Sequence, residues 1–531
     1  MRSVSKVSGL TGLAIILASL SYGATITGTV RRSDGSLFRG AFIQAENTKT
    51  RISVYVLSGK DGQYRAQNLP GGVYNLQIRA VGYRADSHQG LNLGANQTTS
   101  VDFELQAGMV RWSDLSGYQG KQLLPDGKGK QLIEQQCFAC HMFQSRMAAV
   151  KRDRDGWVQA VSFMRTAMHS RLGDVFSDQD AEAVINYLNT TFGVDSNLPK
   201  SPTEIPGYDK TVRPVADNAL NIVYVEYDMP GPNRMPFSAV PDKDGYLWIP
   251  DFGPANRIGR LDPKTGHIEE FVVPNKGTAS VHSAVPAPDG SVWAAEQSSN
   301  KLAKLDPNSK QVTEYQDTYA PGKEGLENGG SKHTVRVDPK GRVWGTAVFA
   351  PLTVYDPKTG EFTHFKDVIS PYGVEIDKNG RAWFAEFREG GEIGFADADT
   401  GKVARFAPPT PHGWPRRIEI GRDGMIWVAE YLGGRIDRFD PQTHVFKEYK
   451  LPGPDPTPYA LGIDDNGYIW YSSDDMDVVG RLDPKTGNVT EYPYVHAENM
   501  MKEFFTDKQG HMWYGSPPNN KVGYFYLSNS K

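Results

Sequence analysis

The chain begins with apolar and polar residues that alternate in short runs. Between residues 24 and 106 these runs include 26–30, 41–45 and 72–78, and glycine or proline residues separate them. Alternation with a period of two is typical of a strand that buries one face, and glycine and proline mark the turns between strands. The pattern predicts a small antiparallel β-sandwich over residues 24–106.

The periodicity becomes helical in the next part of the chain. Apolar residues recur three or four positions apart from Ala181 to Leu188, and Ser177 stands where it can cap the start of that helix. Residues 155–164 are expected to form another helix. The predicted boundaries are 126–195 for a small all-α domain, with linkers at 107–125 and 196–218.

The rest of the chain, residues 219–531, is organised as a repeat. A glycine is followed three positions later by tryptophan at seven places, spaced about 44 residues apart, a period within the range of four-stranded propeller blades. The tryptophans are expected to pack between blades: Trp248, Trp293, Trp344, Trp383, Trp427, Trp470 and Trp513. The chain is therefore predicted to be mainly β, with a C-terminal seven-bladed β-propeller.

The ends of the repeat predict how the ring closes. The last strand of the repeat is missing after the seventh tryptophan, whereas a spare copy, residues 223–227, precedes the first blade. We expect this spare strand to complete the last blade, which would leave no open sheet edge.

Length, charge and the N-terminus narrow the class of protein. The 531 residues are enough for about three or four domains. A net charge of −4 favours neither nucleic acid nor an anionic membrane as partner. Arg2 and Lys6, the apolar run 10–20 and the small residues near position 23 predict a signal peptide, residues 1–23. Its cleavage would leave no transmembrane domain and a periplasmic or secreted bacterial protein; an uncleaved anchor is the alternative.

The two cysteines of the chain stand in one pentapeptide. Cys137, Cys140 and His141 have the C-x-x-C-H spacing of covalent haem c attachment. In this interpretation the two thiols hold the porphyrin and His141 is the proximal iron ligand. A zinc site would need further cysteines or histidines at short spacing, which the flanking sequence does not offer. The motif therefore predicts haem c as a cofactor.

The second axial ligand of the iron has several candidates. Met164 follows Trp157 by seven positions on the helix expected at 155–164, and it is the preferred distal ligand. Met168 lies one turn further along the same face. His169, or an open coordination position, is the remaining alternative.

Two positions in each blade are expected to point toward the mouth of the propeller channel. The first lies eight residues before the turn glycine and holds Phe237, His282, His333, Tyr372, Arg416, Tyr459 and Lys502. The second follows each tryptophan by three residues and holds Asp251, Glu296, Ala347, Glu386, Glu430, Ser473 and Ser516.

Scaffold positions of a repeat should be filled alike, and these are not. We therefore expect a site there that uses oxygen ligands for Mg²⁺ or Ca²⁺, or that performs proton transfer. The candidate catalytic residues are His282, His333, Glu296, Glu386, Glu430 and Arg416.

Three resemblances accompany these patterns. The strand and turn order of residues 24–106 resembles carboxypeptidase regulatory-like domains, which implies a binding or spacer module. The helices around the C-x-x-C-H motif resemble a compact cytochrome c domain. The repeats, for example 371–386, resemble the virginiamycin B lyase (streptogramin lyase) family.

The lyase resemblance implies Mg²⁺-assisted β-elimination that opens an ester-closed peptide ring. In that family the base is a histidine at the position before the first strand of the last two blades, helped by a glutamate. Here those blades carry Tyr459 and Lys502, so the direct transfer of the mechanism fails. The favoured hypothesis is electron transfer through the haem, with the propeller as the site of a redox partner or a small-molecule substrate. A lyase with an accessory haem domain and a non-catalytic binding protein are the alternatives.

Overall fold

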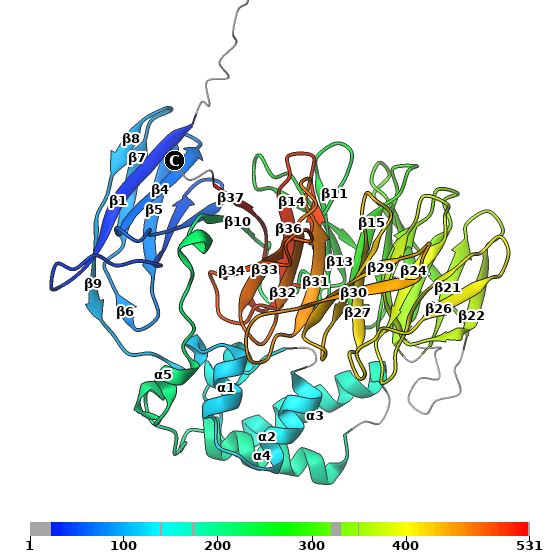
Figure 1. The fold of residues 1–531 in the computed structure, drawn as a ribbon, viewed down its shortest axis with the longest axis horizontal. Coiled ribbons are helices and arrows are strands. Elements are labelled where there is room, and N and C mark those ends of the chain that lie inside the picture. The colour runs from blue at the N-terminus through cyan, green and yellow to red at the C-terminus, as the bar shows by residue number, and fades with distance from the viewer. Residues whose placement is uncertain (1–22, 139–140, 173–175, 320–330, 349, 529–531) are drawn as a thin grey trace, which may run out of the picture.

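The computed structural model describes residues 23–138, 141–172, 176–319, 331–348 and 350–528 (Figure 1). The expected signal peptide, except for its last residue, and Cys140 lie outside the described residues. The fold is mainly β. Its N-terminal part is sandwich-like, its C-terminal part is a propeller-like arrangement of repeated four-stranded sheets, and short helices lie between them in the sequence.

Two sheets pack face to face in the N-terminal part. Their apolar faces meet in one core that includes Ile26, Ile43, Tyr74 and Leu76. One sheet has the order β4-β1-β9-β6, with β8 also paired to β1; the strands are β1 (Ala24–Arg32), β4 (Gln63–Leu69), β6 (Tyr83–Arg84), β8 (Thr98–Ser100) and β9 (Phe103–Ala107). The other contains β2 (Phe42–Asn47), β3 (Ser53–Leu57), β5 (Gly72–Arg79) and β7 (His88–Leu93).

Six antiparallel four-stranded sheets, blades one to six, follow each other along the C-terminal part. They are β11–β14 (Val240–Pro241, Leu247–Asp251, Arg257–Leu261, Ile268–Val272), β15–β18 (Val281–Pro286, Val292–Glu296, Lys301–Asp306, Gln311–Gln316), β19–β22 (Ser331–Val337, Val343–Val348, Pro351–Asp356, Glu361–Ile369), β23–β26 (Pro371–Ile376, Ala382–Glu386, Ile393–Ala396, Val403–Phe406), β27–β30 (Pro415–Ile420, Ile426–Glu430, Arg435–Asp440, Val445–Lys450) and β31–β34 (Pro458–Ile463, Ile469–Ser473, Val478–Leu482, Val489–Pro493).

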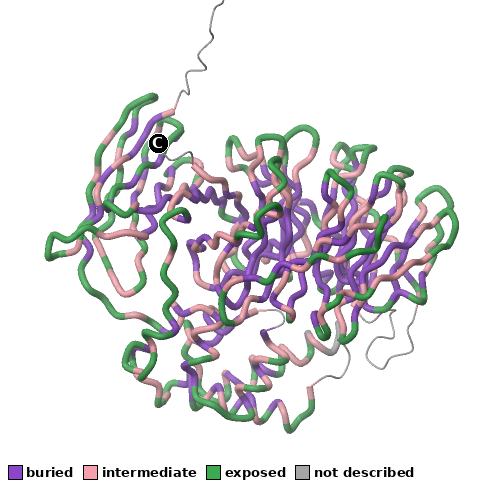
Figure 2. Tube along the Cα trace, viewed as in Figure 1, coloured by how far each residue is buried: buried purple, intermediate pink, exposed green. Residues whose placement is uncertain are grey.

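The repeated tryptophans are packing residues, as predicted. All seven are buried in the cores of the blades. In five repeats the indole Nε1 also donates a hydrogen bond to the aspartate six positions earlier, for example from Trp383 to Asp377 at 3.1 Å. Buried residues concentrate in the middle of the propeller strands, whereas the loops are exposed (Figure 2). These five tryptophans therefore connect a turn to the core of their blade.

The spare N-terminal strand closes the ring as expected. The last blade consists of β35 (Phe505–Thr506), β36 (Met512–Ser516), β37 (Lys521–Leu527) and β10 (Ile222–Asp228), and β10 pairs antiparallel with β37 along its whole length.

The other edge of β10 is also paired, which the sequence did not predict. Tyr224 of β10 lies opposite Tyr55 of β3. The last blade and half of the sandwich therefore form one eight-stranded sheet, β35-β36-β37-β10-β3-β2-β5-β7. The sandwich is a continuation of the propeller, and β10 has no exposed edge.

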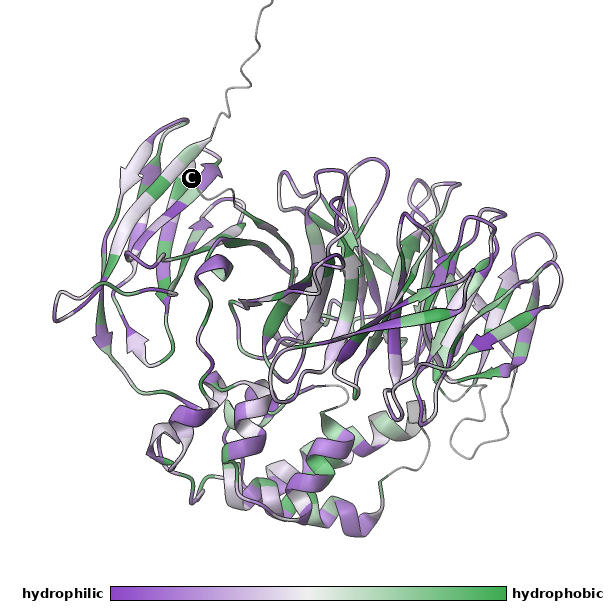
Figure 3. Cartoon of the chain, in the orientation of Figure 1, coloured by the Kyte–Doolittle hydropathy of each residue, from purple (hydrophilic) through white to green (hydrophobic). Residues whose placement is uncertain are grey.

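Helices occupy the segment between the sandwich and β10. They are α1 (Gly117–Leu123), α2 (Lys128–Leu132), α3 (Arg154–Leu172), α4 (Asp178–Phe192) and α5 (Tyr208–Thr211), with π-helical turns at Ile133–Cys137 and Gln144–Ala148 and 3₁₀ turns at Trp112–Asp114, Pro202–Glu204 and Asp217–Ala219; a further 3₁₀ turn is Pro517–Asn519. Ser177 caps α4 as predicted, because its hydroxyl accepts a hydrogen bond from the Asp180 amide at 3.1 Å. The helices mix hydrophilic and hydrophobic residues along their length (Figure 3). Among the described helices none has the length and apolarity needed to cross a bilayer.

The segments expected to be linkers are structured. Residues 107–125 include α1, which a Ser116–Gln119 capping box starts, and residues 196–218 include α5. Trp112 is buried, and its Nε1 donates to the Pro199 carbonyl at 2.8 Å. The two segments are thus joined to each other, and together with α2–α4 they form one helical region.

The helical region packs against one side of the propeller (Figure 1). Lys121 Nζ lies 2.5 Å from Asp475 Oδ2, and the Ser145 amide donates to Glu498 Oε2 at 2.8 Å. Met500 of the propeller belongs to the apolar core of the helical region. The helical region is therefore held to the last two blades by both ion pairs and apolar contacts.

Candidate functional site

The residues that stand eight positions before the turn glycines form a ring around the propeller axis, and five of the seven lie within the first strand of their blade. Consecutive members touch: the ring centroids of Phe237 and His282 are 4.9 Å apart, those of His282 and His333 3.6 Å, and those of His333 and Tyr372 4.0 Å. We call Phe237, His282, His333, Tyr372, Arg416, Tyr459 and Lys502 the axial ring. All seven are buried. The residues that the sequence placed at an open mouth thus meet one another, as expected, but inside the protein.

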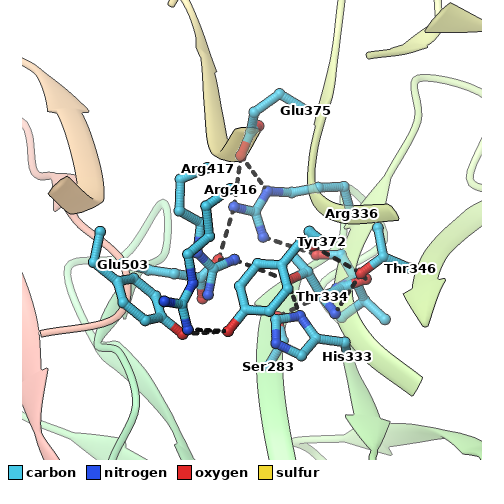
Figure 4. Close-up of polar contacts among 12 residues, drawn as sticks. Ser283, His333, Thr334, Arg336, Thr346, Tyr372, Glu375, Arg416, Arg417 and Glu503 are labelled. Carbon is cyan, nitrogen blue, oxygen red and sulfur yellow. Dashed lines mark hydrogen bonds and ion pairs between the residues drawn. The ribbon is translucent and has the colours of Figure 1, made fainter. Parts of the chain in front are cut away.

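Arg416 is the centre of one half of the axial ring. Its guanidinium carbon lies 3.5 Å from the ring centroid of Tyr459, 4.3 Å from that of Tyr431 and 4.8 Å from that of Tyr372. Its Nη2 donates to the Tyr372 hydroxyl at 3.0 Å, and this hydroxyl also hydrogen-bonds the Tyr459 hydroxyl (Figure 4). Aromatic faces stabilise a desolvated cation, so Arg416 keeps its charge in a buried position.

The surroundings of His333 disfavour its protonated form. Burial holds the pKa of His333 well below its usual range, and the nearby His282, Arg417 and Arg416 lower it further. His333 Nδ1 lies 2.9 Å from the Thr334 hydroxyl oxygen. The positive charge of the axial ring is therefore concentrated on the side of Arg416 and not on His333.

A charged cluster that the sequence analysis missed lies next to the axial ring. Arg336 Nε donates to Glu375 Oε1 at 2.6 Å, and Arg417 Nη1 donates to Glu503 Oε1 at 3.0 Å (Figure 4). The register of the repeat could have shown it, because Arg417 and Glu503 directly follow the axial-ring residues Arg416 and Lys502. These ion pairs hold the first strands of four blades together.

The three predicted glutamates are not brought to the axial ring. Glu296 accepts hydrogen bonds from Asn275 at 2.8 Å and from Ser299 at 2.7 Å. Glu386 accepts from Arg388 Nη2 at 2.5 Å. Glu430 lies beside Asp437 and Glu448. None of their described contacts is to the axial ring.

The strand register explains this difference. Glu296 pairs with Val281, Glu386 with Pro371 and Glu430 with Pro415, and each of these partners directly precedes an axial-ring residue. The glutamates are therefore level with the ring but one strand further out, where side chains of the outer strands bind them. Their position in the repeat therefore predicted correctly how far along the propeller axis the glutamates lie. It predicted incorrectly that their side chains point to the axis.

The C-x-x-C-H segment lies in the helical region beside the propeller. Cys137 ends the first π-helical turn, whereas Cys140 is outside the described residues. His141 is partly buried, and its Nδ1 lies 2.8 Å from the Met142 carbonyl oxygen. Burial lowers the pKa of His141 to about 4, and the positive charges of Arg146 and Lys502 contribute. His141 is thus a neutral imidazole within the electrostatic reach of the axial ring.

These features fit a haem c. A histidine that binds a metal is neutral and uses its second nitrogen for a hydrogen bond that orients the ring, as His141 does. Trp157 is buried, and its Nε1 has no hydrogen-bond acceptor among the described residues. An acceptor on a bound group would satisfy this donor.

The distal candidates share one helix. Met164 and Met168 are half-buried on α3, and the side chain of His169 is outside the description. Both methionines have an unbranched thioether that can bind iron. The described contacts do not distinguish between them.

A cleft lies where the three parts of the molecule meet. Its volume is about 1010 Å³, and its walls include Arg79 of the sandwich, Gln144 and Ser145 of the helical region, and Asp477 and His496 of the propeller. Gln144 and Ser145 follow His141 by three and four residues. The wall of the cleft therefore includes residues that closely follow the C-x-x-C-H segment in the sequence. The axial-ring residues, by contrast, are buried.

Comparisons with known proteins support two of the three parts. Residues 25–106 match the carboxypeptidase regulatory-like domain, and residues 357–529 match the virginiamycin B lyase family. No curated protein matches the chain. Neither family match includes residues 107–356, which contain the C-x-x-C-H segment.

Solved structures resemble the propeller. A streptogramin B lyase structure is 24% identical, with a TM-score of 0.53, over 59% of this chain and 100% of that chain. A virginiamycin B lyase from Staphylococcus aureus is 21% identical, with a TM-score of 0.52, over 58% of this chain and 100% of that chain. At these identities the likeness shows the fold.

Proposed function

We propose that this protein is an exported c-type haem protein that transfers electrons, with the propeller side of the cleft as the site of its partner or substrate. The observation that carries the proposal is His141: the histidine of a C-x-x-C-H motif, partly buried, with a lowered pKa and with its Nδ1 hydrogen-bonded to a backbone carbonyl. The N-terminal signal pattern supports export, because c-type haem is attached outside the bacterial cytoplasm.

The residues of the helical region have distinct roles in this proposal. Cys137 and Cys140 hold the cofactor covalently, His141 is the proximal ligand and Met164 the preferred distal ligand, with Met168 as the alternative. Haem c, when bound, supplies reversible one-electron transfer. Arg146 and Lys502 add positive charge near His141, which favours the reduced state.

The propeller contributes the surroundings of the redox centre. A redox partner or small-molecule substrate would enter the cleft, because the axial ring is buried. Arg416, which the rings of Tyr372, Tyr431 and Tyr459 surround, supplies a positive charge that can balance a negative charge accompanying electron transfer. A protein of this kind acts as an oxidoreductase or as an electron carrier.

The experiment that tests the proposal is potentiometric titration of purified full-length protein and three methionine variants. Met164→Ala is expected to lower the reduction potential, because loss of a thioether ligand removes its preference for the reduced iron. Met109→Ala is the matched control, since Met109 is exposed. A fall in Met168→Ala alone would reassign the distal ligand. The absence of any reversible redox transition in the wild-type protein would refute electron transfer.

A lyase activity is the second candidate, and one observation favours it. His282 and Glu296 belong to the same blade, and Glu296 pairs with the residue that precedes His282. The family resemblance implies a histidine base at this position of a later blade, helped by a glutamate, and blade two supplies one residue of each type. Mg²⁺-dependent opening of a cyclic depsipeptide that is lost in His282→Ala would support this candidate.

A further inference from the structure

Blade five differs from the other blades at one buried position of its third strand. Asp437 of β29 lies opposite Val428, the residue that follows the repeated tryptophan. In the other blades the register places small, uncharged residues at this position, namely Gly259, Ala303, Thr353, Gly394, Gly480 and Gly523. A carboxylate at this position is therefore not required by the fold.

Asp437 faces two further carboxylates. One ligand oxygen from each of Glu430, Asp437 and Glu448 lies within 4.8 Å of the others. Glu430 and Asp437 are completely buried, and all four of their carboxylate oxygens lack a hydrogen-bond donor among the described residues. Arg435, whose Nη1 is 3.4 Å from Glu448 Oε1, is the cation that faces the group. Three acids against one base leave excess negative charge.

The backbone is shaped to hold the carboxylate of Glu430. A Cβ at Gly413 would lie 2.5 Å from Glu430 Oε1, and a Cβ at Gly433 would lie 2.8 Å from Glu430 Oε2. An alanine at either position would therefore force the Glu430 carboxylate to move. Two loops thus use glycine to make room for a buried acid that has no hydrogen-bonding partner there.

Buried carboxylates without donors are costly unless a proton or a cation compensates them. Protons compensate partly, since burial and the neighbouring acids raise the pKa of Glu430 to about 7 and that of Asp437 to about 8. A divalent ion would satisfy the oxygens in their charged form. Carboxylate oxygens are the ligands of hard cations such as Ca²⁺ and Mg²⁺.

We propose that Glu430, Asp437 and Glu448 bind one hard divalent cation inside blade five, where it joins strands β28, β29 and β30. Glu448 is partly exposed and provides the route of entry from solvent. Three carboxylates can supply up to six oxygens, which suits Ca²⁺, whereas Mg²⁺ keeps more of its water. This site is separate from the haem and from the axial ring, so the proposal does not depend on electron transfer.

The test uses full-length protein from which metal has been removed with a chelator. Isothermal titration with CaCl₂ and, separately, with MgCl₂ measures affinity and stoichiometry, and thermal denaturation measures stabilisation. We expect one equivalent of Ca²⁺ to bind and to raise the melting temperature, with a weaker effect of Mg²⁺. The Ca²⁺ effect should be larger at pH 8 than at pH 5.5, because protons compete for raised-pKa carboxylates.

Two variants and a control make the result specific. Asp437→Ala installs the residue of blade two, so it should fold, and it should bind Ca²⁺ more than about tenfold more weakly. Glu448→Gln should also weaken binding and serves if Asp437→Ala does not fold. Glu314→Gln removes the corresponding acid of blade two, which faces Ala303, and should leave Ca²⁺ binding unchanged. Failure of the wild-type protein to bind either ion, or unchanged binding in Asp437→Ala, would overturn the proposal.

Discussion

The helical region and the axial ring of the propeller are built in opposite ways. The C-x-x-C-H segment takes its chemistry from five consecutive residues. The axial ring takes one residue from each of seven repeats, and strands far apart in the sequence hold those residues together. One substitution within the C-x-x-C-H segment can change its chemistry, whereas the arrangement of the axial ring depends on the whole propeller. Variants of the two regions show how strongly they depend on each other.

The largest effect is expected from breaking the ion pair that joins the helical region to the propeller. Lys121→Ala would leave Asp475 buried without its cation, and we expect a loss of about 3 kcal/mol in the free energy of unfolding. Urea denaturation measures this. Lys128→Ala is the matched control, because its pair with Asp180 is largely exposed and should be worth less than about 1 kcal/mol.

The same pair predicts a pH dependence. Burial raises the pKa of Asp475 to about 6, and Lys121 opposes this rise. A carboxyl group whose pKa is raised in the folded protein loses stability as pH rises from its unfolded value through its folded value. The loss caused by Lys121→Ala should therefore be larger at pH 8 than at pH 5. An equal loss at both pH values would contradict this, because it would show that Lys121 does not shift the pKa of Asp475.

A smaller effect is expected inside the axial ring. Arg416→Met removes the cation that contacts Tyr372, Tyr431 and Tyr459, and we expect a loss of about 2 kcal/mol in the free energy of unfolding. The visible spectrum of the haem should not change. Arg422→Met, at an exposed pair with Asp465, should have little effect on stability. A changed haem spectrum in Arg416→Met would mean that the ring and the haem are closely coupled.

The smallest effect is expected at Lys502, the axial-ring residue whose charge acts on His141 of the C-x-x-C-H segment. Lys502→Met removes a positive charge near His141, so the reduction potential should fall by less than it does in Met164→Ala. Lys508→Met is the control, because Lys508 contacts only the Lys243 carbonyl among its described hydrogen-bond partners. An unchanged potential in Lys502→Met would separate the two regions electrostatically.

Sequence patterns predicted the parts of the fold that repeat or alternate. The tryptophan spacing located the blades, and the spare strand before blade one predicted that β10 pairs with β37. The pairing of β10 with β3 could not be predicted, because edge strands carry no sequence signal for a second partner. The helices in residues 107–125 and 196–218 were missed because they are short and are stabilised by contacts such as that of Trp112 with Pro199.

In the candidate site, the place of a residue along the propeller axis was easier to predict than the direction in which its side chain points. The axial ring follows from register alone, since one position per blade faces the axis. The glutamates failed because a residue at the end of a second strand can turn either to the axis or to the outer strands. The direction of each glutamate depends on a neighbouring side chain, namely Asn275, Arg388 or Asp437. No local sequence pattern reveals how close these neighbours lie to the glutamates.

The most direct test of the central claim is the haem content of purified full-length protein produced with the machinery for covalent haem attachment. A pyridine haemochrome spectrum distinguishes haem c from non-covalent haem, and the ratio of haem to protein gives the stoichiometry. We predict one covalent haem c per chain, lost when Cys137 and Cys140 are both replaced by alanine. A wild-type protein without covalent haem under these conditions would contradict the account.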